Sequence, residues 1–81
     1  MRIVLSRQAA ISASDAPPPI RKAFYKQLGF LERDLHHPSL HAKKYDEARD
    51  IWQARVSRDW RFYFKIVDDA YVIRDVVAHP K

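Results

Sequence analysis

The stretches Ile51-Trp52-Gln53-Ala54-Arg55-Val56 and Trp60-Arg61-Phe62-Tyr63-Phe64-Lys65 alternate between apolar and polar side chains. A period of two is typical of a β-strand that buries one of its faces. One face of the two stretches is built from tryptophan, alanine, valine and phenylalanine, while the other carries arginine, lysine, glutamine and tyrosine. The stretches therefore predict neighbouring strands of a sheet that has a packed face and a basic face.

The short connection between these stretches predicts an antiparallel hairpin. We expect a three-residue loop that leaves Val56 opposite Trp60, because this register keeps the apolar side chains on one face. The same register places Arg55 opposite Arg61, and like charges directly opposite each other are destabilising. The arginine pair indicates a binding site for an anion, unless each arginine pairs with a carboxylate from residues 46–50.

A third strand is expected after the hairpin. Asp68-Asp69 predicts a tight turn into the apolar run 71–77. If the turn has two residues, Val72, Arg74 and Val76 lie on the same face as the two arginines. The three consecutive strands would form an antiparallel meander.

The N-terminal half of the chain predicts a short strand and two helices. Residues 2–5 are β-like, and Ser6 is a suitable N-cap for a helix over 7–11. The prolines at 17–19 suit the first turn of a second helix, in which Gly29 would permit close packing. One face of this helix carries Ile20, Ala23, Phe24, Leu28, Leu31 and Leu35.

A loop is expected from the end of this helix to about residue 44. The predicted fold is α+β, with two N-terminal helices packed on a twisted, mainly antiparallel four-stranded sheet.

Length and composition favour one small, basic domain. The chain has 81 residues, which suffice for one domain with a modest core, so we expect residues 1–81 to form a single domain. It contains no cysteine, which is compatible with a reducing cytoplasm. Fifteen Lys and Arg residues against ten Asp and Glu give a net charge of +5, which attracts polyanions, with ordinary solubility charge as the alternative. No apolar run approaches the roughly 20 residues of a membrane span, so we expect a cytoplasmic protein without a membrane partner.

The order of these features resembles that of a known toxin family. The matching motifs are Ile51-Trp52-x-x-Arg55-Val56, Trp60-Arg61-Phe62-Tyr63, Asp68-Asp69 and Val77-Ala78-His79. Together with the short strand, the two helices and the lysine-containing loop, they resemble the RelE/HigB-type toxins of the RelE/ParE superfamily, from type II toxin–antitoxin systems. The resemblance covers essentially the whole chain. It implies a small domain that cleaves mRNA, usually in the ribosomal A site.

The resemblance assigns catalytic roles to three residues. RNA cleavage through the 2′-hydroxyl needs a base, an acid and cations on the phosphate, but no metal and no other cofactor. Arg55 and Arg61 match the strand arginines of the family, and guanidinium groups suit a phosphate. His79 matches the C-terminal histidine that several members use as acid or base, and an imidazole has an ordinary pKa of about 6.5. Unbroken alternation would put His79 on the packed face, so the strand must bulge or end near Ala78-His79.

Further basic and aromatic residues are candidates for RNA binding. They are Lys43, Lys44, Tyr63, Lys65 and Arg74. Lys43 and Lys44 match basic residues ahead of the family's second strand, with solvated loop lysines as the alternative. Tyr63 suits stacking on a base, although an aromatic side chain in a sheet more often serves packing. Asp46 or Glu47 is a candidate general base, because some members carry a carboxylate near this position.

The chain also departs from the family pattern. It stops at Lys81, whereas many relatives continue through a terminal tyrosine or further basic residues, so the catalytic set could be reduced. His36, His37 and His41 share a proline-containing loop, without the spacing or the cysteine partners that favour metal binding. We expect no metal site and interpret this loop as a cationic edge of the RNA surface.

The resemblance further implies a cognate antitoxin as a partner, beside mRNA and the ribosome. We expect an antitoxin segment with acidic and apolar residues that folds on the basic protein. Two kinds of alternative stay open. The first is a non-catalytic toxin of the ParE type that acts on DNA gyrase, or a degenerate homologue that only binds its antitoxin. The second is a general nucleic-acid-binding domain. The grouping of Arg55, Arg61 and His79 favours the endonuclease, because a ParE-type protein has no need to keep these residues together.

Overall fold

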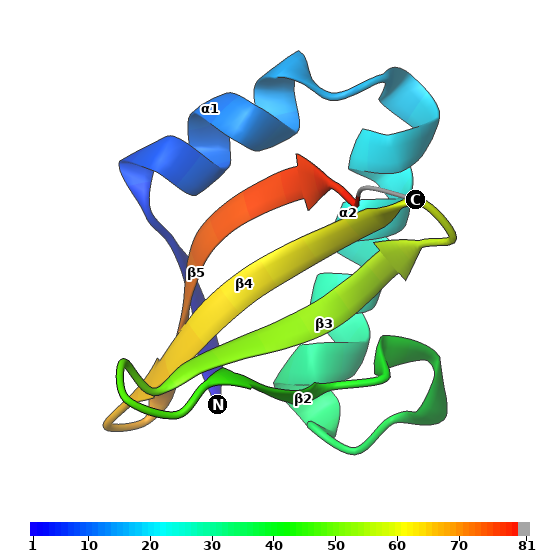
Figure 1. Cartoon of the computed structure of the whole chain (residues 1–81). Helices are drawn as coiled ribbons and strands as arrows, with labels where there is room; N and C mark the ends of the chain where they lie inside the picture. Colours follow the sequence, from blue (N-terminus) through cyan, green and yellow to red (C-terminus); the bar gives the residue numbers. More distant parts are fainter. Residues whose placement is uncertain (80–81) are drawn as a thin grey trace.

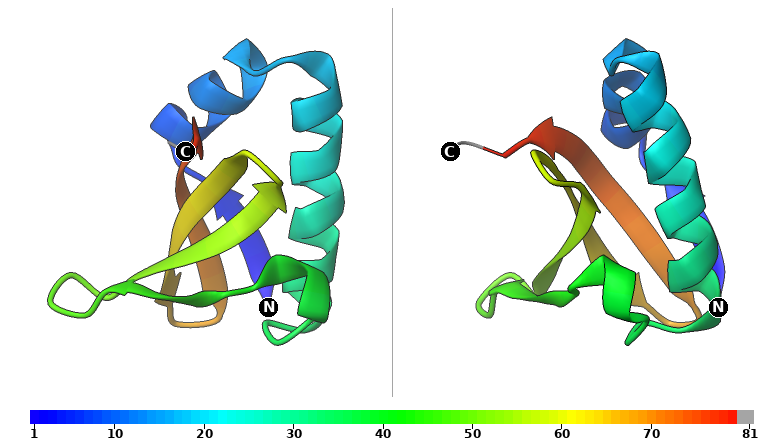
Figure 2. Two further views of the ribbon diagram at one scale, coloured as in Figure 1. Left: turned by 45° about the vertical axis from the view of Figure 1, so that its right-hand side comes forward. Right: turned by 90° about the vertical axis from the view of Figure 1, so that its right-hand side faces the viewer.

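The computed structural model describes residues 1–79 as a single sheet with helices packed against it (Figure 1). In chain order the elements are β1 (Arg2–Leu5), α1 (Arg7–Asp15), α2 (Pro18–Arg33), the 3-10 helix η1 (Pro38–Leu40), β2 (Lys43–Asp46), β3 (Ile51–Ser57), β4 (Trp60–Val67) and β5 (Ala70–Ala78). The strand order is β1-β5-β4-β3-β2. Figures 1 and 2 show that α2 runs along one face of the sheet and that α1 lies beside the end of β5. No helix within residues 1–79 is long and apolar enough to cross a membrane.

The α+β class and the two N-terminal helices are confirmed, but the sheet has five strands where the sequence predicts four. The additional strand is β2, which pairs antiparallel with β3 through Lys43 opposite Gln53 and Lys44 opposite Trp52. Its sequence, Lys-Lys-Tyr-Asp, carries no apolar alternation. A short charged strand at the edge of a sheet needs none, because it buries no face of its own. β1 pairs with β5 in parallel, which makes the sheet mixed.

The first helix begins as predicted and runs further. The Ser6 Oγ accepts a hydrogen bond from the Ala9 N–H at 3.1 Å, which caps α1. The helix continues to Asp15, beyond the expected end at Ile11. Its buried residues are Ala9 and Ala13, whose small side chains allow a close approach to the rest of the core.

The second helix begins within the triple proline, as predicted. Pro17 is its N-cap residue and Pro18 its first residue. Among residues 1–79, a Cβ atom on Gly29 would meet nothing within 4 Å apart from its chain neighbours and the adjacent backbone of its own helix, so the expectation that this glycine permits close packing is wrong. The glycine costs about 1 kcal/mol of helix propensity relative to alanine. The burial of the α2 face offsets this cost.

The core lies between α2 and the packed face of the sheet. The largest fully buried side chains are Phe24, Phe62, Phe64, Leu31, Leu40 and Ile73. Phe24 of α2 meets Phe62 of β4 edge-on, with ring centroids 5.5 Å apart. Edge-to-face contacts add about 0.5–1.5 kcal/mol beyond the burial of area. This contact fixes α2 against the middle of the sheet and leaves the basic face on the other side.

The hairpin has the predicted arginine pair and a different turn. β3 and β4 are antiparallel, and Arg55 lies opposite Arg61. Nearer the turn the register shifts, so that Ser57 rather than Val56 pairs with Trp60. The turn therefore has two residues instead of the predicted three. A β-bulge absorbs the extra residue and keeps Val56 buried in the core.

A second bulge interrupts β5. Phe64 lies opposite Ile73, but the next pair joins Tyr63 to Asp75, so Arg74 is the extra residue. Two residues of β5 therefore face one residue of β4 at this point, which shifts the alternation of the rest of the strand.

The β5 bulge determines where the C-terminal histidine lies. Val76 is buried, although unbroken alternation would put it on the basic face. Val77 instead lies opposite Arg61, and His79 follows two residues later on the same side. The interruption that the sequence predicts next to the histidine thus occurs earlier, at Arg74.

Candidate active site

The basic face of the sheet contains a cavity of about 510 Å³, which we call the cationic cavity. Its chemically active lining residues are His41, Lys43, Gln53, Arg55, Arg61 and His79. They come from four places in the chain: the end of η1, the edge strand β2, the β3–β4 hairpin and the end of β5. The three residues with predicted catalytic roles therefore line one cavity, and Lys43 joins them. No carboxylate of residues 1–79 lines it.

Arg61 is held in place by the turn that connects β3 and β4. Its Nη1 atom donates hydrogen bonds to the backbone oxygens of Ser57 at 2.7 Å, Trp60 at 2.9 Å and Arg58 at 3.2 Å. A guanidinium group has five N–H donors, so the other nitrogens keep donors for a ligand. The turn fixes the position of the positive charge before any ligand arrives.

Arg55 is held less tightly. Its side chain is half-buried, and it has no carboxylate oxygen within 4.0 Å among residues 1–79. Its backbone oxygen accepts a hydrogen bond from the Gln27 Nε2 at 2.8 Å, which ties β3 to α2. The alternative that carboxylates from residues 46–50 neutralise the two arginines does not hold within the described part of the chain.

His79 reaches the cationic cavity through the β5 bulge. Its backbone N–H donates a hydrogen bond to the Asp59 backbone oxygen at 2.6 Å. Asp59 belongs to the same turn whose carbonyl groups hold Arg61. The turn therefore contacts both the histidine backbone and the arginine side chain, while the imidazole remains exposed.

His41 is a site residue that the sequence does not single out. It follows η1 with a left-handed φ of 47°, which turns the chain into β2 and brings its side chain to the cationic cavity. The other loop histidines lie elsewhere: the His37 ring stacks on Phe30 with centroids 3.9 Å apart, and His36 is exposed. The spacing of the three histidines does not show which of them reaches the cavity, because the left-handed backbone at His41 decides where the chain turns.

The adjacent lysines Lys43 and Lys44 lie on opposite faces of the sheet. Lys44 pairs in register with Trp52, and its Nζ lies 5.1 Å from the centroid of that ring. It also forms an ion pair with Asp50. The hydrogen bond between these two groups raises the pKa of Lys44 and lowers that of Asp50. Lys44 is thereby engaged away from the cationic cavity, and Lys43 is the lysine that lines it.

The candidate carboxylate bases do not reach the cationic cavity. Asp46 accepts a hydrogen bond from the Arg49 backbone N–H at 3.1 Å and lies 3.7 Å from the Arg49 Nε. Glu47 is exposed and lies 4.0 Å from Lys44. Both residues lie at the connection between β2 and β3, away from the residues that line the cationic cavity.

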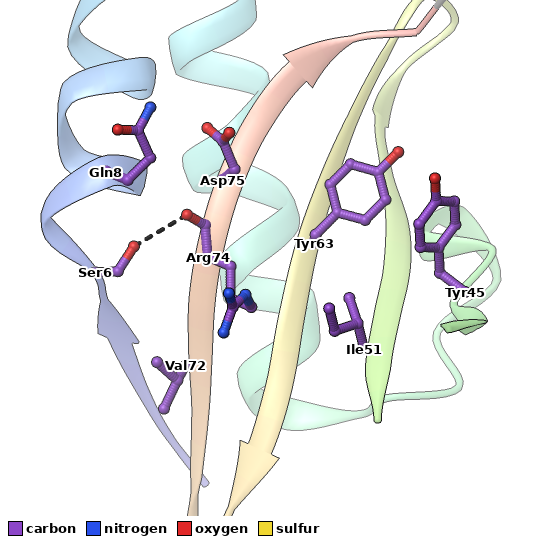
Figure 3. A pocket seen from close by; sticks show the side chains of 8 residues that line it. All are labelled: Ser6, Gln8, Tyr45, Ile51, Tyr63, Val72, Arg74 and Asp75. Atoms are coloured by element: carbon purple, nitrogen blue, oxygen red, sulfur yellow. Dashed lines mark hydrogen bonds between the residues drawn. The ribbon is translucent and has the colours of Figure 1, made fainter. Parts of the chain in front are cut away.

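A second cavity, of about 490 Å³, lies on the same face of the sheet, and Figure 3 shows the residues that line it. We call it the tyrosine pocket; its lining includes Ser6, Gln8, Tyr45, Ile51, Tyr63, Val72, Arg74 and Asp75. Gln53, which lines the cationic cavity, donates from its Nε2 to the Tyr63 hydroxyl at 3.1 Å. Of the candidate RNA-binding residues, Tyr63 and Arg74 lie here. Lys65 lines neither cavity and pairs in register with Val72.

Solved structures of toxins have the same fold. A YoeB/ParE toxin from Agrobacterium tumefaciens superposes with a TM-score of 0.81 at 9% identity, over 99% of this chain and 100% of that chain. A chain of the RelE–RelB complex from the archaeon Pyrococcus horikoshii gives a TM-score of 0.78 at 17% identity, over 95% and 92%. A chain of the RelBE2 toxin–antitoxin complex from Mycobacterium tuberculosis gives 0.78 at 22% identity, over 96% and 90%.

Comparison of the sequence with protein-family models gives no match, and neither does comparison with curated proteins. The likeness is therefore one of three-dimensional structure, and it extends over nearly the whole chain. This protein has the fold of the RelE/ParE-type toxins.

Proposed function

We propose that this protein is the toxin of a type II toxin–antitoxin system, and that it is an endonuclease that cleaves mRNA without a metal. The observation that carries the proposal is the convergence of Arg55, Arg61 and His79 in the cationic cavity, together with His41 and Lys43. A cavity with fixed cations, imidazoles and no carboxylate suits a phosphodiester, because it offers positive charge together with groups that transfer protons. The toxin fold supports the same proposal.

The proposed reaction uses the RNA's own 2′-hydroxyl as the nucleophile. One imidazole removes the proton of the 2′-hydroxyl, and the oxygen attacks the neighbouring phosphorus to form a 2′,3′-cyclic phosphate. The bond between phosphorus and the 5′-oxygen breaks, and a second imidazole donates a proton to that oxygen. His79 and His41 are the candidates for these two roles, because both line the cationic cavity.

The two arginines would neutralise the charge that develops on the phosphate. Arg61 is the pre-positioned donor, because backbone oxygens of the turn already fix its Nη1. Fixed donors of this kind need no reorganisation during the reaction, which is the basis of electrostatic catalysis. Arg55 has no such anchor and would close on the phosphate when RNA binds.

The proposed partners are mRNA, the ribosome and an antitoxin. The resemblance stated above implies cleavage in the ribosomal A site, and a net charge of +5 favours encounter with ribosomal RNA. The solved relatives include complexes of toxin with antitoxin, such as RelE with RelB and YoeB with YefM. We propose an antitoxin with acidic and apolar residues that covers the cationic cavity. Failure of the neighbouring small reading frame's product to co-purify would count against it.

The test adds the purified protein to mRNA with and without translating ribosomes and maps new RNA ends by primer extension. Arg55→Ala is the most informative variant, because the Arg55 side chain has no hydrogen bond or ion pair within residues 1–79 that its loss would break. Loss of one fixed oxyanion donor typically costs about 10²–10³-fold in rate, which is the loss expected for Arg61→Ala. Arg55→Ala should also lower the rate, and Arg33→Ala, at the exposed end of α2, is the matched control.

New RNA ends that depend on Arg55 and Arg61, but not on Arg33, would support the endonuclease. Their dependence on ribosomes would define its type. A folded protein that inhibits growth and yields no new ends would overturn the proposal in favour of a ParE-type or binding-only protein.

A further inference from the structure

We infer that the tyrosine pocket is a nucleobase subsite, which holds a base of the RNA strand whose phosphate occupies the cationic cavity. The inference rests on the proposed function and adds a second binding site to it. It starts from two aromatic side chains on the open face of the sheet. Tyr45 is 61% exposed, and its ring meets Tyr63 edge-on with centroids 4.9 Å apart. Figure 3 shows the two rings side by side, with their hydroxyl groups pointing the same way.

Burial in the core does not explain the exposed tyrosine, which lies on the opposite face of the sheet. Tyr45 lies on the edge strand β2 and is not part of the hydrophobic core cluster. With Ile51 and Val72, the two tyrosines make the pocket mainly apolar. A flat apolar wall of this kind suits the face of a base, since stacking on aromatic side chains is the usual mode of single-strand recognition.

The polar groups of the pocket suit the edge of a base better than a phosphate. The Arg74 guanidinium has no hydrogen bond or ion pair within residues 1–79, so its donors are available. Asp75 uses Oδ1 to accept from Ser12 Oγ at 2.5 Å and from the Val76 N–H at 2.8 Å, which fixes the carboxylate and leaves Oδ2 for a ligand. A carboxylate repels a phosphate but accepts hydrogen bonds from base N–H groups.

One hydrogen bond between β3 and β4 joins a residue of the cationic cavity to a residue of the tyrosine pocket. Gln53 lines the cationic cavity and donates to the Tyr63 hydroxyl, and these residues lie opposite each other in register. The next pair toward the turn on the same face is Arg55 with Arg61. Two residues along a strand span about 6.8 Å, so a phosphate at the arginines and a base at Tyr63 can belong to neighbouring nucleotides of one strand.

The first test needs no cleavage. NMR spectra of the protein are recorded during titration with inorganic phosphate and with each of the four ribonucleoside 5′-monophosphates. Inorganic phosphate is expected to shift the signals of Arg55 and Arg61. The nucleotides should in addition shift the ring signals of Tyr45 and Tyr63, most strongly for the preferred base. Nucleotides that produce the same shifts as inorganic phosphate, with the tyrosine rings unmoved, would overturn the inference.

The second test measures the affinity for a short RNA with 2′-O-methyl groups, which the protein cannot cleave by the proposed route. Tyr45→Ala should weaken binding by about tenfold, within the range that loss of one stacking contact produces. Tyr25→Ala is the matched control, because Tyr25 is similarly exposed but lies on α2. An abasic nucleotide at the contacted position should abolish the difference between wild type and Tyr45→Ala. Equal affinity of the two tyrosine variants would refute the subsite.

These outcomes separate the subsite from the proposed function. Tyrosine shifts and a Tyr45 effect on affinity, in a protein that does not cleave mRNA, would support the subsite and overturn the endonuclease. Cleavage that depends on Arg61 but is unchanged in Tyr45→Ala, for all bases, would support the endonuclease and overturn the subsite.

Discussion

Arg55 and Arg61 lie opposite each other, and yet their surroundings differ. Three backbone oxygens hold the Arg61 Nη1, while the Arg55 side chain has no carboxylate partner within residues 1–79. The repulsion between the two side chains is therefore only partly relieved by the protein. An anion that contacts both guanidinium groups would relieve it further, in agreement with the proposed role of the pair in holding a phosphate.

His41→Asn and His79→Gln should each lower the single-turnover rate of RNA cleavage by about 10²–10⁴-fold, the usual contribution of a general acid or base. Asparagine tolerates a left-handed backbone, so His41→Asn should preserve the turn at φ 47°. The rates are measured at saturating RNA for each variant. The double variant should lose less than the product of the two effects, because residues that act as a unit are not additive.

His36→Asn is the matched control for these variants, since His36 belongs to the same loop and does not line the cationic cavity. An equal loss of rate in His36→Asn would attribute the effect to the loop and not to an imidazole. An unchanged rate in His41→Asn would remove His41 from the reaction.

The ion pair between Lys44 and Asp50 should be visible in a titration. Hydrogen bonding and attraction to Lys44 lower the pKa of Asp50 below its ordinary 3.8. The pair therefore favours the folded state above that value, and the contribution is lost as pH falls through the lowered pKa. The raised pKa of Lys44 gives the converse limit: the contribution is present below 10.5 and is lost as pH rises through the raised value.

We expect the Asp50 carboxyl carbon to titrate by NMR with a midpoint below 3.8 in the wild type. The midpoint should move upward in Lys44→Gln, because the partner charge is removed. Lys43→Gln, on the opposite face of the sheet, should leave it unchanged. An Asp50 midpoint that is unchanged in Lys44→Gln would show that the ion pair does not persist in solution.

At the level of elements, the hairpin could be predicted from sequence because its alternation and its core residues agree. Val56, Phe62 and Phe64 are all buried as the pattern predicts. The edge strand β2 could not be predicted, because its four charged and polar residues acquire their conformation from β3 and not from a face of their own. The bulge at Arg74 could not be predicted from sequence either, because the pairing with the neighbouring strand decides where a bulge lies.

The residues of the candidate site could be predicted from sequence where the strands that carry them could be predicted. Arg55 and Arg61 follow from the alternation, and the resemblance adds His79. His41 could not be separated from its neighbours, because a left-handed residue after η1 decides which loop side chain reaches the cavity.

The turn between β4 and β5 offers a test at this level. Asp68 has a φ of 54°, whereas Asp69 is not among the residues with positive φ. A β-branched residue disfavours the left-handed region, so Asp68→Val should destabilise the fold by about 1–2 kcal/mol. Asp68→Gly should cost nothing or stabilise slightly. Urea unfolding measures both, and a larger loss in Asp69→Val than in Asp68→Val would contradict the assigned backbone geometry.

Across the whole molecule, the two cavities share one side of the sheet, where Lys43, Arg55, Arg61 and Arg74 supply positive charge. The helices cover the other side (Figure 2). The cationic cavity and the tyrosine pocket both lie on the open face, joined through Gln53 and Tyr63. A protein of this size with a net charge of +5 would bind RNA weakly over its whole surface as well.

Salt dependence separates the two modes of binding. The logarithm of the affinity for single-stranded RNA should fall with the logarithm of salt concentration, by about 0.7 for each phosphate contacted. Arg55→Ala should reduce that slope by about 0.7, while Lys22→Ala, exposed on α2, should leave it unchanged. Equal flattening by both variants would indicate diffuse binding and favour a general nucleic-acid-binding domain.

The two-residue turn between β3 and β4 has a consequence for how such a site can evolve. Carbonyl groups of the turn and of the strand residues on either side of it hold Arg61, and its Asp59 oxygen accepts a hydrogen bond from the His79 backbone N–H. The side chain of Arg61 and the backbone of His79 are thus held by the same turn. A single insertion or deletion in that turn would displace both residues at once, so the proposed catalytic arrangement would be kept or lost as a unit and not adjusted one residue at a time.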